Sequence, residues 1–335
     1  MDPEISRRIE FLRYSMIFGI VILHTPPYVP LAETGSTFFD FSKAFFQHAF
    51  FRASVPVLTA ISGYLLFAHS LDLNFRLLLT KKTRTLLIPL ILFNLPLVIA
   101  LYFFQQSFPI KHEFSVQLHP FELSVWLNAI VGLNGTPINY PLNFLRDLYV
   151  LALMAPIFGF LIRRYPWIGL IGIFTLFWFD FDGLIIRRNT MPIVFYLGGL
   201  AAVYRWDLKA LDRYAVPLFA VFVALCVSIV YFDIENRNYL RVVSPVLIWP
   251  AVSLVVGTRF GLWVAGKSRY SFFTFLMRAP LLLAFWLFYK KVSTFVPYWS
   301  FWLVTPVFSA IVLSYLYTML RGRYPRIMQF ALGSR

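Results

Sequence analysis

The sequence predicts an all-α membrane protein, a polytopic bundle of about ten transmembrane helices with its N- and C-termini in the cytoplasm. The 335 residues are 59% hydrophobic and 13% charged, whereas a soluble domain carries about 25% charged residues. The mean hydropathy is +0.72. Basic residues recur in short clusters between apolar runs, as in the cytoplasmic loops of membrane proteins. The net charge of +15 therefore indicates membrane orientation and not a nucleic-acid partner.

Ten apolar segments qualify as spans. A span needs about 20 mostly apolar residues, because the hydrocarbon core is about 30 Å thick and each helical residue rises about 1.5 Å. The expected spans are residues 13–30, 50–68, 85–106, 141–162, 167–185, 191–204, 214–232, 242–258, 271–289 and 299–319. The sixth is short, and Asp180, Asp182 and Asn189 lie in the turn before it. Since no repeat, linker or low-complexity tract interrupts the chain, we expect a single transmembrane domain over residues 1–335.

The distribution of positive charge sets the expected orientation. With the N-terminus inside, 19 of the 30 Lys and Arg residues fall on cytoplasmic segments and eight on outer ones. This asymmetry favours an even number of spans with both ends inside. The apolar run after Arg13 lacks a small-residue cleavage site, and Pro26, Pro27 and Pro30 follow it. We therefore expect this run to remain in the protein as the first span.

The first span carries the most informative pair of polar side chains. Arg13 and His24 lie eleven positions apart, and at about 100° per residue this comes within about 20° of three full turns. The two side chains therefore share one helix face, about 16 Å apart along the axis. An imidazole titrates near neutral pH and can act as a general base. The pattern indicates a polar channel that enters from the cytoplasm. The alternative is a structural histidine bonded to a neighbouring carbonyl.

Three further cations lie in or beside the expected spans. For Arg52, Arg146 and Arg278 the alternatives are a functional charge, a structural ion pair or a side chain that reaches the interface. Asp147 follows Arg146 directly, and neighbours in sequence point about 100° apart on a helix. We therefore expect Asp147 to pair across helices, with Arg52 or Arg278, rather than with Arg146.

Two loops can be interpreted in two ways each. Lys81, Lys82 and Arg84 stand before the third span, where a basic cluster sets topology but also suits a nucleotide or phosphate ligand. The expected outer loop, residues 107–140, mixes aromatic and amide side chains that can hold a sugar, although composition favours an ordinary interfacial loop. These loop residues are Trp126, Asn128, Asn134, Gly135, Asn139 and Tyr140.

Signatures of soluble enzymes are missing from the sequence. It has no P-loop, no GxGxxG, no HExxH and no GxSxG motif. Five scattered histidines and one cysteine do not indicate a metal site. Cys226 lies in an apolar run, where it is expected to be a small buried filler.

Five short motifs occur in a fixed order along nearly the whole chain. They are Arg8 to Arg13 with His24, Arg52 with Val55, Pro56 and residues 61–66, residues 81–89, residues 143–148, and residues 271–276 with Pro280. In this order and spacing the chain resembles the acyltransferase-3 family. The resemblance implies an O-acyltransferase of the bacterial inner membrane. It would move an acetyl or other short acyl group from cytoplasmic acyl-CoA to a hydroxyl of an exopolysaccharide or other cell-envelope glycan.

The resemblance also implies roles for individual residues. His24 would be the catalytic base, with Arg13 beside the donor path, and acyl-CoA would meet Arg13, Lys81, Lys82 and Arg84. Acetyl-CoA would be a co-substrate, with no permanently bound cofactor. A lipid-linked oligosaccharide is a possible acceptor, and membrane lipid and polysaccharide synthesis machinery are expected partners. The residues expected at the oxyanion or acceptor site are Arg52, Tyr64, Asn143, Arg146, Asp147 and Arg278.

Departures from the family pattern leave the substrate open. Thr85 stands where the family often has a second arginine, Asn143 stands for a tryptophan, and Arg278 stands for a histidine. Arg278 would suit a donor with a carboxylate, so acetyl and succinyl donors both remain open, as do direct transfer and an acyl-His24 intermediate. The alternative function is a glycan or lipid-linked sugar transporter. Repeated halves would favour a transporter, but the sequence contains no such repeat. A structural subunit of a polysaccharide synthase is a third possibility.

Overall fold

The computed structural model describes residues 2–107, 116–179 and 185–333. These residues form helices and connecting turns, with no strand in the described part of the chain, so the all-α prediction is confirmed. The longer helices are α1 (Pro3–Leu23), α3 (Ser54–Ala68), α5 (Ile88–Ser107), α7 (Asn143–Arg164), α8 (Pro166–Trp178), α9 (Thr190–Val203), α10 (Ala215–Tyr231), α11 (Asn238–Ala251), α14 (Ser268–Val292) and α15 (Tyr298–Arg323).

Shorter helices connect or extend the longer ones. They are α2 (Phe38–Ala44), α4 (Phe75–Lys82), α6 (Leu123–Val131), α12 (Ser253–Val256), α13 (Arg259–Gly266) and α16 (Pro325–Ala331). Before α3 the chain forms a π-helical turn, η2 (Phe45–Ala49), and a 3-10 turn, η3 (Phe50–Ala53). A second π-helical turn, η5 (Thr83–Leu87), precedes α5.

Seven helical stretches of the described chain are long and apolar enough to cross a membrane. They are Phe38–Ala68, Phe75–Ser107, Tyr140–Arg164, Asp212–Tyr231, Asn238–Val256, Ser268–Val292 and Tyr298–Arg323. Helices α8 and α9 are apolar but shorter, and the first half of α1 carries several charges. Each of the ten expected segments thus overlaps a helix, although α1 ends at Leu23, inside the expected first span. The count of ten spans and the side of the two ends stay predictions. Asp180 and Asp182 lie outside the described residues, as do positions 108–115 of the expected outer loop.

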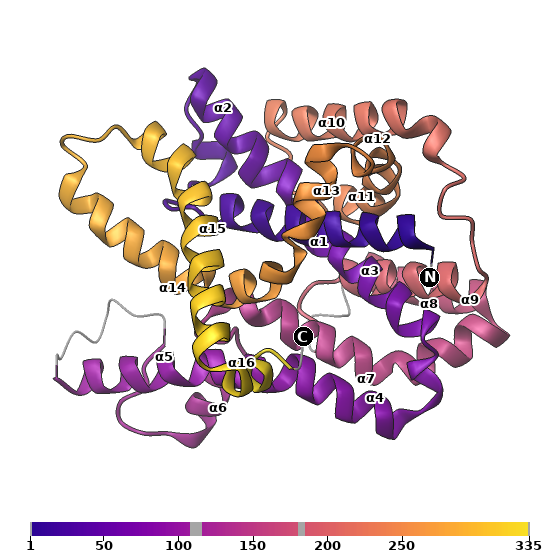
Figure 1. Ribbon diagram of the computed structural model, residues 1–335, viewed down its shortest axis with the longest axis horizontal. Coiled ribbons are helices and arrows are strands. Elements are labelled where there is room, and N and C mark those ends of the chain that lie inside the picture. Colours follow the sequence, from indigo (N-terminus) through magenta and orange to yellow (C-terminus); the bar gives the residue numbers. More distant parts are fainter. Residues whose placement is uncertain (1, 108–115, 180–184, 334–335) are drawn as a thin grey trace.

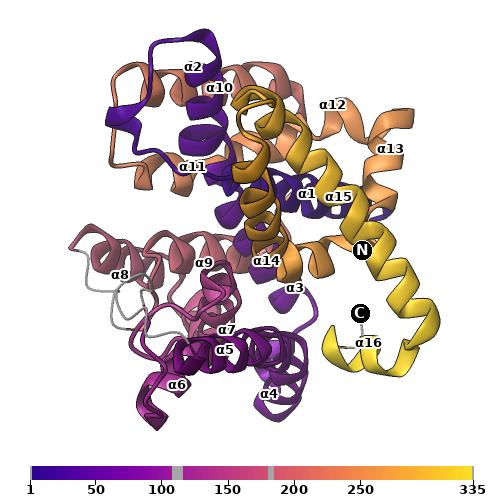
Figure 2. The same cartoon turned by 90° about the vertical axis from the view of Figure 1, so that its left-hand side faces the viewer.

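Helix α1 occupies the middle of the molecule. In Figure 1 it lies between α10 and α11 on one side and α5 and α7 on the other, and the end view in Figure 2 shows the same order. It contacts α3, α13 and α14. Helices α14 and α15 form a hairpin beside it, and α16 then returns to α5. A side chain on α1 can therefore meet residues from both halves of the bundle.

Helices α3 and α9 cross with their backbones in close approach, which small residues permit in membrane bundles. A Cβ atom on Gly198 of α9 would lie 2.2 Å from the carbonyl oxygen of Ala60 on α3. A Cβ atom on Gly63 would lie 2.3 Å from the carbonyl oxygen of Phe195. Only glycine fits at either position with this spacing, so the pair fixes how closely the two helices pack.

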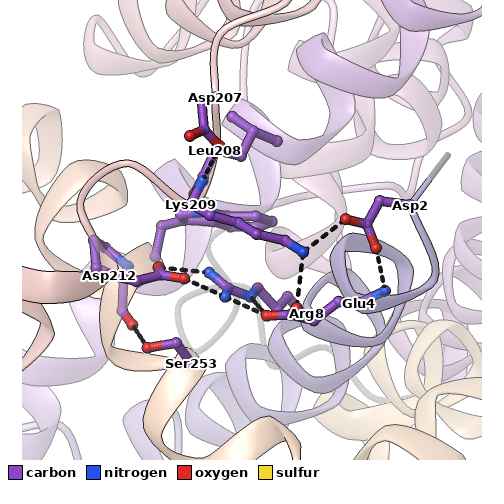
Figure 3. Close-up of polar contacts among 10 residues, drawn as sticks. Asp2, Glu4, Arg8, Asp207, Leu208, Lys209, Asp212 and Ser253 are labelled. Carbon is purple, nitrogen blue, oxygen red and sulfur yellow. Dashed lines mark hydrogen bonds and ion pairs between the residues drawn. The ribbon is translucent and has the colours of Figure 1, made fainter.

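The N-terminal half of α1 is anchored by Arg8, whose side chain is 1% exposed. Its Nη1 donates to Oδ1 of Asp212 at 2.8 Å, and its Nε donates to Oε1 of Glu4 at 3.2 Å. The guanidinium also lies 5.9 Å from the ring centroid of Trp249 on α11. Figure 3 shows how these contacts tie α1 to the segment that leads into α10.

A second, exposed pair of contacts completes this anchor. Nζ of Lys209 lies 2.7 Å from Asp2 and 2.8 Å from Glu4, as Figure 3 shows. The hydrogen bond to Asp2 contributes most to raising the pKa of Lys209, and the hydrogen bond to Glu4 contributes next. Asp2 also caps α1 by accepting from the backbone N–H of Glu4 at 2.8 Å, a favourable position for a carboxylate at a helix N-terminus. The anchor therefore restrains both the rotation and the axial position of α1.

Candidate active site

His24 ends α1 and has a defined tautomer. Its Nδ1 lies 2.9 Å from the carbonyl oxygen of Ile20, and because a carbonyl only accepts, Nδ1 carries the hydrogen. Nε2 of the neutral ring is then the acceptor nitrogen. The ring lies 5.3 Å from the ring of Tyr140, centroid to centroid. A purely structural histidine, bonded to a neighbouring carbonyl, was the alternative expected for His24. The observed bond to Ile20 is of that kind, but it leaves Nε2 available as a base.

The first of three cavities around α1 is lined by aromatic side chains, and we name it the Trp286 cavity. Its volume is about 480 Å³, and its lining includes His24, Arg52, Tyr28, Tyr140 and Trp286. Flat aromatic faces with a few polar groups suit a sugar ring and its hydroxyls. His24 is therefore exposed to a space that can accommodate a hydroxyl-bearing acceptor.

The second cavity, which we name the central cavity, has a volume of about 170 Å³ and also contains His24. Apart from His24 and Thr190, its polar lining is basic, with Arg52, Arg188, Arg241 and Arg278. Arg52 and His24 line both this cavity and the Trp286 cavity. The two spaces therefore meet at the histidine.

The third cavity, the Arg13 cavity, is the largest of the three at about 690 Å³. Its basic residues are Arg13, Arg269 and Arg321, and Glu10 also lines it. Arg13 is exposed in this space, and its side chain forms no hydrogen bond with another described residue. Three guanidinium groups at one opening suit the phosphates of a nucleotide.

One face of α1 lines the Arg13 cavity and the central cavity in succession. Glu10, Arg13 and Ile17 line the Arg13 cavity, and Ile20 and His24 line the central cavity. The predicted shared face of Arg13 and His24 is thus confirmed. The channel is not polar throughout, however, because Ile17 and Ile20 are both buried between the two ends. A flexible, largely uncharged chain fits this stretch better than a charged group does.

The expected donor cluster lies apart from the Arg13 cavity. Lys81 and Arg84 are exposed and Lys82 is half-buried, but none of the three lines the cavity. Leu86, on the same segment, does. Close by, a Cβ atom on Gly333 would lie 2.6 Å from the carbonyl oxygen of Arg84, so the C-terminal segment covers this backbone. The predicted contact of the cluster with acyl-CoA stays a prediction.

The expected acceptor-side residues divide into two groups. Arg52 and Arg278 come together at the central cavity. Asn143 is buried beside Phe144, and its Oδ1 has no hydrogen-bond partner among the described residues. Tyr64 instead lines a separate apolar cavity of about 220 Å³ that also holds Trp249. The structure therefore does not bring Tyr64 to His24.

The expected pairing of Asp147 was wrong. Nη1 of Arg146 lies 2.8 Å from Oδ1 of Asp147, and it also donates to the carbonyl oxygen of Ile185. The angle between neighbours on a helix describes Cβ directions, but the long arginine side chain folds back to the carboxylate. Since Asp147 is fully buried, the adjacent cation offsets the cost of burying its charge.

The polar residues of the expected outer loop mainly hold the loop itself. Oδ1 of Asn128 accepts from the backbone N–H groups of Asn134 at 2.8 Å and Gly135 at 2.6 Å. Trp126 packs on Tyr102 with ring centroids 5.3 Å apart. Asn139 is buried, and only Tyr140 of the loop residues singled out lines a cavity with His24. The interfacial interpretation therefore does not fit Tyr140, nor Asn139, whose Nδ2 donates to the carbonyl oxygen of Leu276 on α14 at 3.2 Å.

Sequence reasoning missed several residues of this site. The expected spans place Arg188 and Arg241 among the eight cations on outer segments, with no link to His24, and the sequence does not single out Tyr28 or Trp286. Arg188 precedes α9 and Arg241 lies on α11, so no local spacing connects either to His24. One signal in the sequence could have found Arg241. It lies in an apolar helix, three residues before Ser244, and a cation in such a helix needs a polar environment.

Comparisons with known proteins identify the family of the chain. A family model for acyltransferase-3, described as an acyltransferase domain, matches residues 6–319. The chain belongs to the acyltransferase-3 family. A relative, the succinoglycan biosynthesis protein ExoH of Rhizobium meliloti (strain 1021), is 31% identical over 356 residues, which cover 100% of this chain and 94% of the relative. No solved structure matches the chain.

Family membership confirms the resemblance found in the motifs. As an acyltransferase-3 protein, the chain is an acyltransferase by family, and its apolar helices mark a multi-pass membrane protein. Residues of all five motifs line the cavities beside α1: Arg13 and His24 lie on that helix, and the other four motifs contribute Arg52, Leu86, Phe144 and Phe275.

Proposed function

We propose that this protein transfers a short acyl group from cytoplasmic acyl-CoA to a hydroxyl of an exopolysaccharide or related envelope glycan, with His24 as general base. The observation that carries the proposal is the position of His24 between two cavities of different chemistry. On one side the aromatic Trp286 cavity suits a sugar, and on the other the basic cavities suit an acyl-CoA. The ExoH relative, a succinoglycan biosynthesis protein, supports a polysaccharide acceptor. The proposal places the reaction in the bacterial inner membrane.

The donor would bind along the α1 face. Its nucleotide phosphates would meet Arg13, Arg269 and Arg321 in the Arg13 cavity, which would open to the cytoplasm. The pantetheine arm would pass Ile17 and Ile20 and bring the thioester to the central cavity. The axial separation of about 16 Å between Arg13 and His24 suits an extended arm of this kind. Acyl-CoA is a co-substrate in this scheme, consumed in each turnover.

His24 would supply the proton transfer. Its Nε2 would take the hydroxyl proton as the acceptor oxygen attacks the thioester carbonyl. The carbon–oxygen bond forms, the carbon–sulfur bond breaks, and the departing CoA sulfur takes a proton from the imidazolium. The bond from Nδ1 to Ile20 holds the ring in the tautomer that this step needs.

Arg52 would stabilise the oxyanion of the tetrahedral intermediate. It lines both cavities that meet at His24, and its Nε donates to the carbonyl oxygen of Gln47 at 3.0 Å. That bond fixes the plane of the guanidinium, so its other N–H groups are pre-oriented. A fixed donor at the position of developing charge is the strongest contribution a site of this kind makes.

The test is transfer of radiolabel from acetyl-CoA and from succinyl-CoA by the purified protein in nanodiscs, with a glycan extract as acceptor. His24→Ala should lower transfer by about 10³-fold. His69→Ala is the matched control, because His69 also ends a helix and its Nδ1 also lies near a carbonyl oxygen, that of Leu65 at 2.7 Å. His69 is exposed and lines none of the three cavities, so its replacement should leave transfer unchanged.

Two outcomes would reject the proposal. Transfer at the normal rate by His24→Ala would show that His24 is not the general base. The lack of His24-dependent use of either donor would favour the other class of function, a glycan or lipid-linked sugar transporter, which moves its substrate without consuming acyl-CoA.

A further inference from the structure

Arg146 and Asp147, at the start of α7, form a buried ion pair that the proposed transfer does not use. Asp147 is fully buried, and Nη1 of Arg146 lies 2.8 Å from its Oδ1. The sequence placed both residues at the oxyanion or acceptor site, but neither lines any of the four cavities. Stability alone is a weak reason for such a pair, because desolvation offsets much of the attraction between the two charges.

The pair holds the irregular segment 185–188, which leads into α9. Nη1 of Arg146 donates to the carbonyl oxygen of Ile185, and the carboxylate of Asp147 attracts the backbone N–H of Arg187. A segment outside a regular helix needs other partners for its backbone polar groups. Since α7 supplies two of them, we name Arg146 and Asp147 the α7 clamp.

The clamped segment ends at Arg188, which lines the central cavity with His24. The charges of Asp147 and Arg188 attract each other, although the two side chains form no direct ion pair in the described part of the chain. The carbonyl oxygen of Arg188 accepts from the backbone N–H of Met191 on α9 at 2.9 Å. The backbone of Arg188 is therefore restrained from both sides, by the α7 clamp before it and by α9 after it.

A cation with a fixed position contributes more to acyl transfer than a mobile one. Charge that develops during the reaction is best stabilised by groups that are already oriented. A displacement of about 1 Å, caused by a change away from the reacting atoms, can lower a rate by about 10²-fold. Because the arginine side chain is long and flexible, the position of Arg188 beside His24 depends on a rigid backbone.

We propose that Arg146 and Asp147 are positioning residues for acyl transfer. They hold the backbone of segment 185–188, so that the guanidinium of Arg188 faces the reacting carbonyl. This inference rests on the proposed function and adds to it two residues that do not touch a substrate. The clamp acts on the transition state and not on donor binding, because the proposed nucleotide site lies in a separate cavity.

The experiment measures kcat and the donor KM of a clamp variant, Arg146→Gln with Asp147→Asn, in nanodiscs. The donor is whichever of acetyl-CoA and succinyl-CoA the native protein uses, with the same glycan extract as acceptor. The double change removes both charges and keeps similar shapes, so it leaves no buried charge without its partner. We expect kcat to fall by about tenfold or more, with the donor KM unchanged.

A second ion pair on α7 provides the matched control. Nη1 of Arg163 lies 2.6 Å from Oδ2 of Asp72. Like Asp147, the buried Asp72 has one oxygen without a hydrogen-bond partner among the described residues. Neither Asp72 nor Arg163 lines any of the four cavities. Asp72→Asn with Arg163→Gln should therefore lower the thermal stability as the clamp variant does, but it should keep the native kcat.

Two further measurements test whether the clamp acts through Arg188. Adding Arg188→Gln to the clamp variant should lower kcat no further than Arg188→Gln does by itself, because the clamp then has no cation to position. Hydrogen–deuterium exchange at the backbone amides of segment 185–188 should be faster in the clamp variant and unchanged in the Asp72 control. The exchange measurement needs no turnover.

Several results would overturn the inference. A native kcat in the clamp variant, or an equal loss of kcat in the Asp72 control, would leave Arg146 and Asp147 as a structural ion pair. Losses that multiply in the combined variant would show that the pair does not act through Arg188. Unchanged exchange in the clamp variant would show that the pair does not hold the segment. Absence of His24-dependent turnover in the native protein would instead reject the proposed function, and with it any role of the clamp in transfer.

Discussion

Phe144 of α7 and Phe275 of α14 meet edge to face, with ring centroids 5.7 Å apart and ring planes at 71°. Both residues line the Arg13 cavity and the central cavity. The pair therefore stands at the boundary between the space proposed for the nucleotide and the space that contains His24. In the proposed scheme a pantetheine arm would pass these two rings, which would hinder the entry of water when no donor is bound.

Replacing one of the two rings with a smaller side chain should let the enzyme hydrolyse acyl-CoA even when no acceptor is present. Phe144→Leu is expected to raise acyl-CoA hydrolysis without acceptor several-fold, because water then reaches the thioester more easily. Phe158→Leu is the matched control, since Phe158 is also buried on α7 but lines none of the cavities. The measurement is CoA release in the presence and absence of glycan. Equal hydrolysis by both variants would show that the ring pair is no barrier.

The basic residues of the Arg13 cavity give a second prediction. Arg269→Ala with Arg321→Ala should raise the donor KM by about tenfold, because each removes a charge-assisted contact to phosphate. Arg323→Ala, at the same end of α15, is the control and should leave KM unchanged. The acceptor KM should not move in any of these variants. A donor KM that stays constant would show that the nucleotide binds elsewhere.

The cluster before the third span is tested in the same assay. Lys82→Ala with Arg84→Ala should also raise the donor KM, but by less than the cavity pair, because these residues do not line the cavity. An unchanged value would assign the cluster to membrane topology alone. The comparison of the two double variants shows which set of cations holds the phosphates.

The helix that carries Arg13 and His24 was predictable from sequence because its signal is local. The eleven-residue spacing of Arg13 and His24 sets a shared face of α1 whatever the rest of the chain does. The apolar segments likewise fall on helices, since length and hydropathy are properties of each segment alone. What the spacing does not give is the lining between the two residues, where Ile17 and Ile20 make the path apolar.

The rest of the site depends on packing between distant helices. Arg188 precedes α9 and Arg241 belongs to α11, and only the fold brings them to Arg278. The wrong pairing of Asp147 has a different cause. Helix geometry gives the direction of Cβ atoms but not the reach of a flexible side chain, so Arg146 can bond its own neighbour.

Arg8 provides a prediction on stability. Arg8→Ala should lower the free energy of unfolding by about 2 kcal/mol, because it leaves Glu4 and Asp212 without their shared cation. The loss is smaller than for a fully buried pair, since both carboxylates are partly open to water. Lys209→Ala should have no measurable effect, because its pairs are exposed and screened. Equal losses in the two variants, measured by thermal unfolding in detergent, would contradict this account of the anchor.

The crossing of α3 and α9 gives the last prediction. Gly198→Ala would place a Cβ atom 2.2 Å from the carbonyl oxygen of Ala60, and backbone cannot move aside as a side chain can. The helices must separate, which should cost about 3 kcal/mol. Separation should also lower turnover, because η3, just before α3, carries Arg52, and α9 begins at Thr190 in the lining of the central cavity.

The matched control for this crossing is Gly172→Ala on α8. No atom lies within 4 Å of a Cβ at Gly172, so this change should be neutral or should stabilise by up to about 1 kcal/mol, the usual gain from alanine within a helix. Thermal unfolding and acyl transfer are measured on both variants. If Gly198→Ala kept native stability and turnover, the close approach of α3 and α9 would not be what holds Arg52 beside His24.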